Sequence, residues 1–90
     1  MSHFVYILYS SSKDRYYIGS SADVENRLLR HNAGATPSTR AGRPWKIVFE
    51  KEFVSKTEAL KYESYLKRLK SRSFIQTLIK KNNRSIERPG

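Results

Sequence analysis

The run of six apolar residues from Phe4 to Tyr9 constrains the fold of this chain more than any other feature. Together with His3, it is rich in aromatic and β-branched side chains and apolar at both odd and even positions, which is typical of a central β-strand. It is far shorter than the roughly 18 residues that a membrane-spanning helix needs. No N-terminal stretch resembles a signal peptide, so we expect a cytoplasmic protein.

A polar turn and a second short strand, Tyr16–Ser20, follow this run and predict a β-hairpin. With a loop over Ser11–Asp14, Tyr6 pairs with Gly19 across the hairpin. Because side chains alternate along a strand, Tyr6, Tyr17 and Gly19 then lie on one face of the sheet. A shift of one residue in the pairing would place the two tyrosines on opposite faces.

Three helices are expected from capping signals and periodicity. The first covers residues 22–32, between the start signal Asp23 and the stop signal Gly34. Capping boxes at Ser55–Glu58 and Ser73–Gln76 predict a long helix and a short one. The apolar stripe of the long helix consists of Ala59, Leu60, Tyr62, Leu66 and Leu69.

The segment Trp45–Phe53 predicts a third strand with one dominant apolar face, which contains Trp45, Ile47, Phe49 and Phe53. The resulting order of elements, ββαβαα, is that of an α+β domain in which helices pack on a small sheet. A chain of 90 residues has room for one such domain, which we expect to cover residues 1–79. The basic segment 80–90 that follows is expected to fray.

Positive charge is concentrated in the last third of the chain. The 18 Lys and Arg residues outnumber the 8 Asp and Glu residues, which gives a net charge of +10. Residues 61–90 hold nine basic and two acidic residues, a net of +7, whereas residues 1–60 hold nine and six, a net of +3. Such a chain favours a polyanion as its partner, and nucleic acid is the first expectation. The alternative is a basic surface that serves solubility.

Glu63 is the most informative acidic residue. Its spacing from Ala59 and Leu66 places a carboxylate within the apolar stripe or at its edge. A buried carboxylate is costly unless it has a cation, hydrogen-bond donors or a metal. Cysteine is absent and histidine occurs twice, so a bound metal would be a hard cation such as Mg²⁺ or Mn²⁺. The alternative is a structural ion pair, for example with Arg27.

Four further side chains are of types that take part in catalysis, but each position is also typical of a structural role. Arg27 and His31 are four residues apart and share one surface of the first helix. Arginine can bind a phosphate through two hydrogen bonds, yet either residue alone is typical of an ordinary helix surface. Tyr6 and Tyr17 are, taken singly, more typical of strand packing than of catalysis. A phenol has a pKa near ~10 and becomes a base only where positive charge lowers it.

Taken in order along the chain, these residues resemble a known family. The pattern consists of Phe4-Val5-Tyr6, Tyr17-Ile18-Gly19, Arg27-x-x-x-His31 and Glu63. It resembles the GIY-YIG nuclease superfamily, in particular its small single-domain branch, over residues 3–79. The first motif departs from the family, because Phe4 stands where the family has glycine. A family asparagine near the C-terminus has only Asn82 and Asn83 as candidates.

The resemblance implies a three-stranded antiparallel sheet flanked by helices. It also implies a metal-dependent endonuclease that hydrolyses DNA phosphodiester bonds in one step. In this chain Glu63 would bind a single divalent cation, Mg²⁺ or Mn²⁺, and Arg27 would hold the phosphate. Tyr6 or Tyr17 would take a proton from the attacking water, with help from His31. Gly19 is expected to leave room for the phosphate or the water.

Binding of the nucleic acid is expected to involve further basic residues that contact its backbone. These are Arg40, Arg43, Lys67, Arg68, Lys70 and Arg72. Trp45 could stack on a base, but we favour strand packing for it. DNA is a better expectation than RNA, and a partner protein could supply the substrate specificity that larger family members obtain from a second domain. Two alternatives remain at this point: a non-catalytic nucleic-acid-binding module on the same fold, and an RNA-associated protein.

Overall fold

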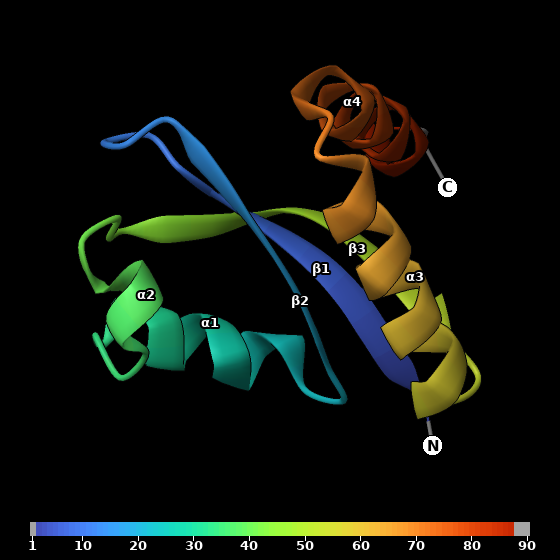
Figure 1. The fold of residues 1–90 in the computed structure, drawn as a ribbon, viewed down its shortest axis with the longest axis horizontal. Helices are drawn as coiled ribbons and strands as arrows, with labels where there is room; N and C mark the ends of the chain where they lie inside the picture. Colours follow the sequence, from blue (N-terminus) through green and yellow to red (C-terminus); the bar gives the residue numbers. More distant parts are fainter. Residues whose placement is uncertain (1, 88–90) are drawn as a thin grey trace.

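The computed structural model describes residues 2–87, with side chains described as far as Lys81. Its sheet has the order β2-β1-β3, and both pairings are antiparallel. The strands are β1 (His3–Ser10), β2 (Arg15–Ser21) and β3 (Trp45–Phe53). The helices are α1 (Val24–Asn32), α2 (Pro37–Arg40), α3 (Lys56–Leu69) and α4 (Arg72–Glu87) (Figure 1). The expected α+β class and three-stranded antiparallel sheet are confirmed, and the short α2 is an addition between α1 and β3.

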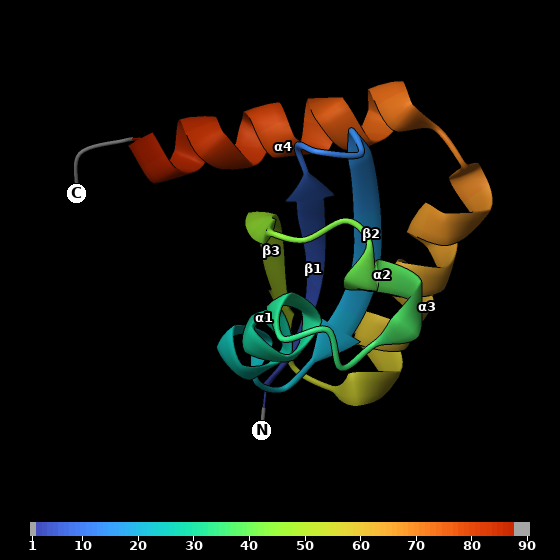
Figure 2. The same ribbon diagram turned by 90° about the vertical axis from the view of Figure 1, so that its left-hand side faces the viewer.

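Both faces of the central strand are buried, which explains its continuous apolar sequence. Val5 and Ile7 pack with side chains of α3 and α4, whereas Tyr6 and Leu8 pack with Val24 of α1. Helices therefore cover the sheet on two sides, with α1 and α2 on one side and α3 and α4 on the other (Figure 1), and α4 runs crosswise to the strands (Figure 2). We call these two sides the α1 face and the α3 face.

The hairpin has the predicted register. Tyr6 pairs with Gly19, and Ser10 pairs with Arg15 at the turn. The side chains of Tyr6 and Tyr17 consequently lie together on the α1 face, within one packed cluster. The prediction that the two tyrosines share a face is confirmed.

The prediction of one dominant apolar face for β3 is wrong, because the strand contains a bulge. Ile7 pairs with Phe49 and Leu8 pairs with Ile47, which leaves Val48 as an extra residue. After the bulge, the alternation of side chains between the two faces of the sheet is shifted by one residue. Trp45 and Ile47 therefore face α1, while Phe49 packs with α3 and α4. One strand thus contributes to both halves of the core.

Helix α3 begins where the capping box predicted, since the Ser55 hydroxyl accepts a hydrogen bond from the Glu58 N–H at 3.2 Å. Its predicted apolar stripe is too wide. Leu66 is buried, but Leu60 is 42% exposed and Leu69 is 40% exposed. Both leucines lie outside the core because α3 buries only a narrow strip against this small sheet.

Helix α4 differs from its prediction at both ends. Its cap is Ser71, whose hydroxyl accepts from the Phe74 N–H at 3.2 Å, and Ser73 of the predicted capping box lies inside the first turn. The helix continues to Glu87, through most of the segment where fraying was expected from residue 80. Residues 88–90 of that segment lie outside the described residues.

Candidate active site

Tyr6 is held on the α1 face with its ring across the edge strand β2. The residue is 1% exposed. A Cβ atom on Gly19 would lie 2.6 Å from the Tyr6 hydroxyl oxygen and 2.7 Å from its Cζ. The phenol ring of Tyr6 therefore fills the space above Gly19. The expectation that Gly19 leaves room there for the phosphate or the water is wrong. Glycine is needed here so that the Tyr6 hydroxyl can pass over β2.

Tyr17 and His31 complete a cluster of three rings. The Tyr17 and His31 ring centroids are 4.8 Å apart in an edge-to-face arrangement, and those of Tyr6 and Tyr17 are 6.4 Å apart. His31 is buried, although its helix is otherwise largely exposed. The hairpin and α1 together position this cluster, because Val24 and Leu28 anchor α1 against the same face.

A hydrogen-bond chain runs through His31. Its Nε2 lies 3.3 Å from the Tyr6 hydroxyl, and its Nδ1 lies 2.8 Å from the Thr39 hydroxyl of α2. Thr39 donates its own proton to the Thr36 carbonyl at 3.3 Å, so it accepts from His31 Nδ1–H. A neutral imidazole carries one proton, which leaves Nε2 free to accept from Tyr6. This bonding pattern assigns the Nδ1–H tautomer to His31 and makes Tyr6 the donor.

The ionisation of this pair is shifted by burial. Burial raises the pKa of Tyr6 to about 12, with Tyr17 and Glu63 acting in the same direction and the positive charge of Arg27 opposing them. Burial also lowers the pKa of His31, and the nearby charges of Arg27 and Arg30 lower it further. Tyr6 is therefore a neutral phenol at neutral pH, and His31 is a neutral imidazole.

Arg27 is an exposed cation beside this pair. The described residues form two salt bridges, and Arg27 takes part in neither of them. It lies one turn before His31 on α1, and its positive charge acts to lower the pKa of both Tyr6 and His31. The side chain is thus available for an anion.

Glu63 approaches the edge strand from the α3 face. Its Oε1 accepts from the Ser20 hydroxyl at 2.8 Å, and its Oε2 pairs with the Lys67 ammonium at 2.7 Å. Its side chain is 14% exposed, so it lies at the border of the apolar stripe. The predicted alternative partner, Arg27, does not pair with it. Tyr6 arrives at β2 from one face and Glu63 from the other, and the negative charge of Glu63 contributes to the raised pKa of Tyr6. We call this set of five residues the edge site: Tyr6, Tyr17, Arg27, His31 and Glu63.

The donor set at Glu63 suits a hard, largely hydrated cation. In the described part of the chain, three metal-binding side chains of the His, Cys, Asp or Glu type do not come together anywhere. One carboxylate beside a hydroxyl cannot enclose Zn²⁺, but it fits Mg²⁺, which keeps several waters and takes few protein ligands. The pairing of Glu63 Oε2 with Lys67 is no obstacle, because Lys67 is 54% exposed and such a pair is worth little.

All six basic residues expected to contact nucleic acid lie exposed on the surface. Arg40 and Arg43 shape the loop after α1, because their Nε atoms donate to the carbonyls of Gly34 and Arg40 at 3.0 and 2.8 Å. Lys67 is paired with Glu63. Arg68 and Lys70 lie at the end of α3, where Lys70 has a left-handed backbone with φ of 47°.

Arg72, the sixth, also makes a structural contact. Its guanidinium donates to the carbonyl and the carboxylate of Asp14 in the hairpin turn. It also lies over the Tyr16 ring, 5.0 Å from the centroid. These contacts join the start of α4 to the hairpin. Arg72 is thus engaged with the hairpin in the folded chain, and its contact with a nucleic-acid backbone stays a prediction.

Trp45 packs in the strand, as we favoured. It is buried, and its Nε1–H donates to the Thr39 carbonyl at 2.7 Å. The Asn32 side chain ties it to α1 through both backbone groups of Trp45. Asn32, Thr39 and Ser20 are the contributors that sequence reasoning missed, because each acts through a contact that is distant in sequence. The side chains of Asn82 and Asn83 lie outside the described residues.

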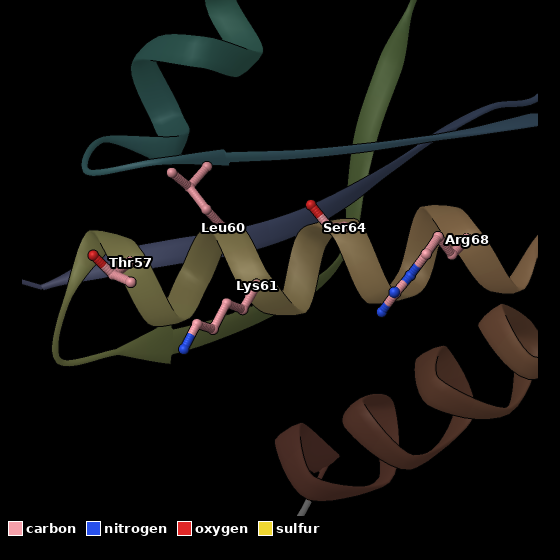
Figure 3. A pocket seen from close by; sticks show the side chains of 5 residues that line it. All are labelled: Thr57, Leu60, Lys61, Ser64 and Arg68. Carbon is pink, nitrogen blue, oxygen red and sulfur yellow. The ribbon is translucent and has the colours of Figure 1, made fainter.

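A groove of about 610 Å³ on the outside of α3 is separate from the edge site. Figure 3 shows Leu60 pointing from α3 toward the strand that leads into α1, with Lys61 on the opposite side of the helix. The groove is lined by Thr57, Leu60, Lys61, Ser64 and Arg68. None of these side chains belongs to the predicted catalytic set. Among the described residues, no helix combines the length and the apolarity needed to cross a membrane.

Comparison with known proteins gives a consistent result. The family model of the GIY-YIG catalytic domain matches residues 2–83. A UPF0213 protein of Streptococcus pneumoniae is 40% identical over 72 residues, which is 78% of this chain and 73% of the relative. A UPF0213 protein of Listeria monocytogenes is 34% identical over 84 residues, 92% of each chain.

A solved structure agrees with these matches. The solution NMR structure of a UPF0213 protein from Bacillus halodurans is 34% identical and superposes with a TM-score of 0.56, covering 91% of this chain and 87% of that one. The fold, the ordered motifs and the family model point the same way. This chain belongs to the GIY-YIG catalytic-domain family.

Proposed function

We propose that this protein is a metal-dependent endonuclease that hydrolyses DNA phosphodiester bonds in one step. One observation carries the proposal: the buried Tyr6 hydroxyl is hydrogen-bonded to His31 at 3.3 Å, on the strand pair whose edge also holds Glu63 through Ser20. We assign the proton acceptor to this pair, the phosphate-binding cation to Arg27 and the carboxylate for a divalent cation to Glu63. Membership of a catalytic-domain family that acts on nucleic acid supports the same function.

The hydrogen-bond chain provides a path for the proton of the attacking water. Because Tyr6 is 1% exposed, its ring has to shift before the attacking water reaches its oxygen. The water then gives its proton to the Tyr6 oxygen while Tyr6 passes its own proton to His31 Nε2, and the resulting hydroxide attacks phosphorus and displaces the leaving oxygen. This relay avoids a free phenolate, which the raised pKa of Tyr6 disfavours. The lowered pKa of His31 keeps its ring neutral and able to accept. We assign Tyr6 to this role because its hydroxyl is the one bonded to the imidazole.

Arg27 and Glu63 are assigned to the charges of the reaction. Arg27 holds the phosphate by hydrogen bonds and stabilises the negative charge that develops on its oxygens. Glu63, with the Ser20 hydroxyl, would hold one Mg²⁺ or Mn²⁺ ion. When bound, such a cation supplies stabilisation of the charge on the leaving oxygen.

A non-catalytic DNA-binding module is the second candidate, and one observation favours it. Both carboxylate oxygens of Glu63 already have protein partners, Ser20 and Lys67. If those contacts persisted in solution, the fold would keep its basic surface without a cation.

Metal-dependent nicking separates the two candidates. Plasmid and branched DNA are incubated with the full chain and Mg²⁺ or Mn²⁺, with EDTA as the blank. We expect cleavage that is lost in Glu63→Gln and Arg27→Ala and retained in Glu58→Gln, a matched control on the exposed side of α3. Cleavage that survives Glu63→Gln would refute the assigned site. Binding without any cleavage by the wild type would favour the second candidate.

A further inference from the structure

A second cavity adjoins the edge site through Tyr17. It has a volume of about 410 Å³ and lies between the hairpin and the segment that contains α2. Tyr17 and Trp45 contribute aromatic surface, Ser38 a hydroxyl, and Lys13 and Arg15 positive charge. We call it the hairpin cavity.

The charge of the hairpin cavity is uniformly positive. No carboxylate lines it, and the Lys13 and Arg15 side chains are exposed. Neither cation takes part in the two salt bridges of the described residues. An anionic ligand would therefore meet no repulsion there, and it would find two cations free to bind it.

Small residues keep the floor of the cavity open. A Cβ atom on Gly42 would lie 2.5 Å from Cζ2 of Trp45, so the indole rests directly on the backbone. Ala41 beside it is exposed and adds one methyl group. The cavity is thus bordered by aromatic side chains and short ones, which suits a flat ligand. Pockets that bind small organic ligands usually measure about 300–1,000 Å³, and this cavity falls within that range.

We propose that the hairpin cavity binds the base and sugar of one unpaired nucleotide of the DNA strand that lies at Tyr17. A nucleotide unites the two required properties, because its base is flat and its phosphate is anionic. The proposal rests on the proposed function and narrows its substrate. A base can enter only after it has left the duplex stack, so strands with an unpaired nucleotide beside the cleavage point are preferred over fully paired DNA.

The chain offers its own reporter for this binding. Trp45 is the single tryptophan, and it lines the cavity. The full chain is titrated in EDTA with a short oligothymidylate and with an abasic oligomer of equal length and charge. We expect the oligothymidylate to change the Trp45 emission and to bind at least about 5-fold more tightly, since stacking of one base is worth this much or more.

Two substitutions that fill the cavity test its location. Ala41→Phe and, as a second variant, Ser38→Phe place a ring in the cavity, whereas Ala35→Phe places the same ring on an exposed residue of the same loop that does not line it. The two filled variants should lose the preference for the oligothymidylate and retain binding of the abasic oligomer. Ala35→Phe should behave as the wild type. Thermal melts confirm that each variant is folded.

Equal affinity for the two oligomers, or an unchanged Trp45 emission at saturation, would overturn the proposal. So would a base preference that survives in both filled variants. Because EDTA prevents any cation-dependent cleavage, a protein without nuclease activity gives the same readout. Failure of the titration is therefore distinguishable from failure of the proposed function.

Discussion

At the residue scale, Thr39 is the side chain that determines what Tyr6 and His31 can do together. It accepts from His31 Nδ1–H and so directs the Nε2 lone pair at the Tyr6 hydroxyl. Thr39 touches no reacting atom, which makes it a positioning residue. Nothing in its local sequence indicates this role, because the contact depends on how α2 folds back onto α1.

Thr39→Val should release this constraint while preserving the shape of the side chain. Removing the hydroxyl leaves a buried N–H without an acceptor, so we expect a loss of about 1–3 kcal/mol of stability and a mixture of His31 tautomers. The ¹⁵N shifts of the imidazole report the tautomer directly, and with two histidines in the chain the signals are easily assigned. Thr39→Ser should restore the wild-type tautomer. An unchanged His31 spectrum in Thr39→Val would contradict this role.

Glu63→Gln should leave the stability of the metal-free protein almost unchanged. The amide oxygen can still accept from Ser20, and the pair that is lost, with Lys67, is an exposed i,i+4 pair worth about 0.3–0.5 kcal/mol. Chemical denaturation in EDTA measures the difference, with Glu58→Gln as the control on the same helix. A loss of roughly 3–5 kcal/mol would instead indicate a buried structural ion pair and would count against the cation site.

The lowered pKa of His31 predicts how both activity and stability depend on pH. Because the folded pKa is below the ordinary value of 6.5, the unfolded chain binds the proton more readily. The contribution of His31 to stability is therefore fully present above pH 6.5 and is lost as the pH falls below 6.5 through the lower folded pKa. Tyr6, Tyr17 and Thr39 contact the ring, and the charges of Arg27 and Arg30 act on it.

The cleavage rate should depend on pH in the same direction as the stability. It should decrease below pH 6.5, because His31 becomes protonated and can no longer accept from Tyr6. Initial rates against pH, with melts at each pH, check both statements. An acidic limb centred above 6.5 would show that His31 is not the acceptor.

At the element scale, the sequence predicted which helices and strands form, and where several of them begin, better than it predicted which of their faces are buried. The hairpin register followed from the loop length and the alternation of β1 and β2, and it was correct. The bulge at Val48 could not be predicted, because an extra residue leaves the local apolar pattern of β3 intact and appears only when the strand is paired. The width of the buried strip on α3 was overestimated for a similar reason, since it depends on how much sheet is available to cover.

The contact between α4 and the hairpin predicts different effects for substitutions of Arg72, which makes this contact, and of Arg68, which does not. Arg72→Gln removes the bonds to Asp14 and should lower the melting temperature without changing the salt dependence of DNA binding. Arg68→Gln, which removes an exposed cation from the end of α3, should reduce the slope of log K against log salt by about 1 if it contacts a phosphate. Binding isotherms at several salt concentrations distinguish the two variants. The opposite pattern would place Arg72 in the binding surface.

At the scale of the whole molecule, the sequence indicated which side chains of the edge site lie together on the α1 face, but not the side from which Glu63 approaches. Tyr6 and Tyr17 were placed together by the register, and Arg27 and His31 by their helical spacing. Glu63, however, reaches the site from the other face of the sheet and is oriented by Ser20. A two-sided site of this kind depends on β2 being the edge strand, and strand order cannot be read from local patterns.

The distribution of charge over the folded molecule predicts the strength of the salt effect on DNA binding. Of the six basic residues first considered, Arg72 is held by Asp14 and Lys67 by Glu63, which leaves Arg40, Arg43, Arg68 and Lys70. If these four, Arg27 of the edge site and the Lys13 and Arg15 pair of the hairpin cavity neutralise about six phosphates in all, log K should decrease with log salt at a slope between about −4 and −5, the lower magnitude applying to single strands. Fluorescence anisotropy of a labelled oligonucleotide in EDTA, over a range of NaCl concentrations, measures the slope without cleavage. Glu58→Gln should not alter it, because the residue is an exposed carboxylate at the far end of α3. A slope near zero would show that the +10 charge of the chain is not its binding surface.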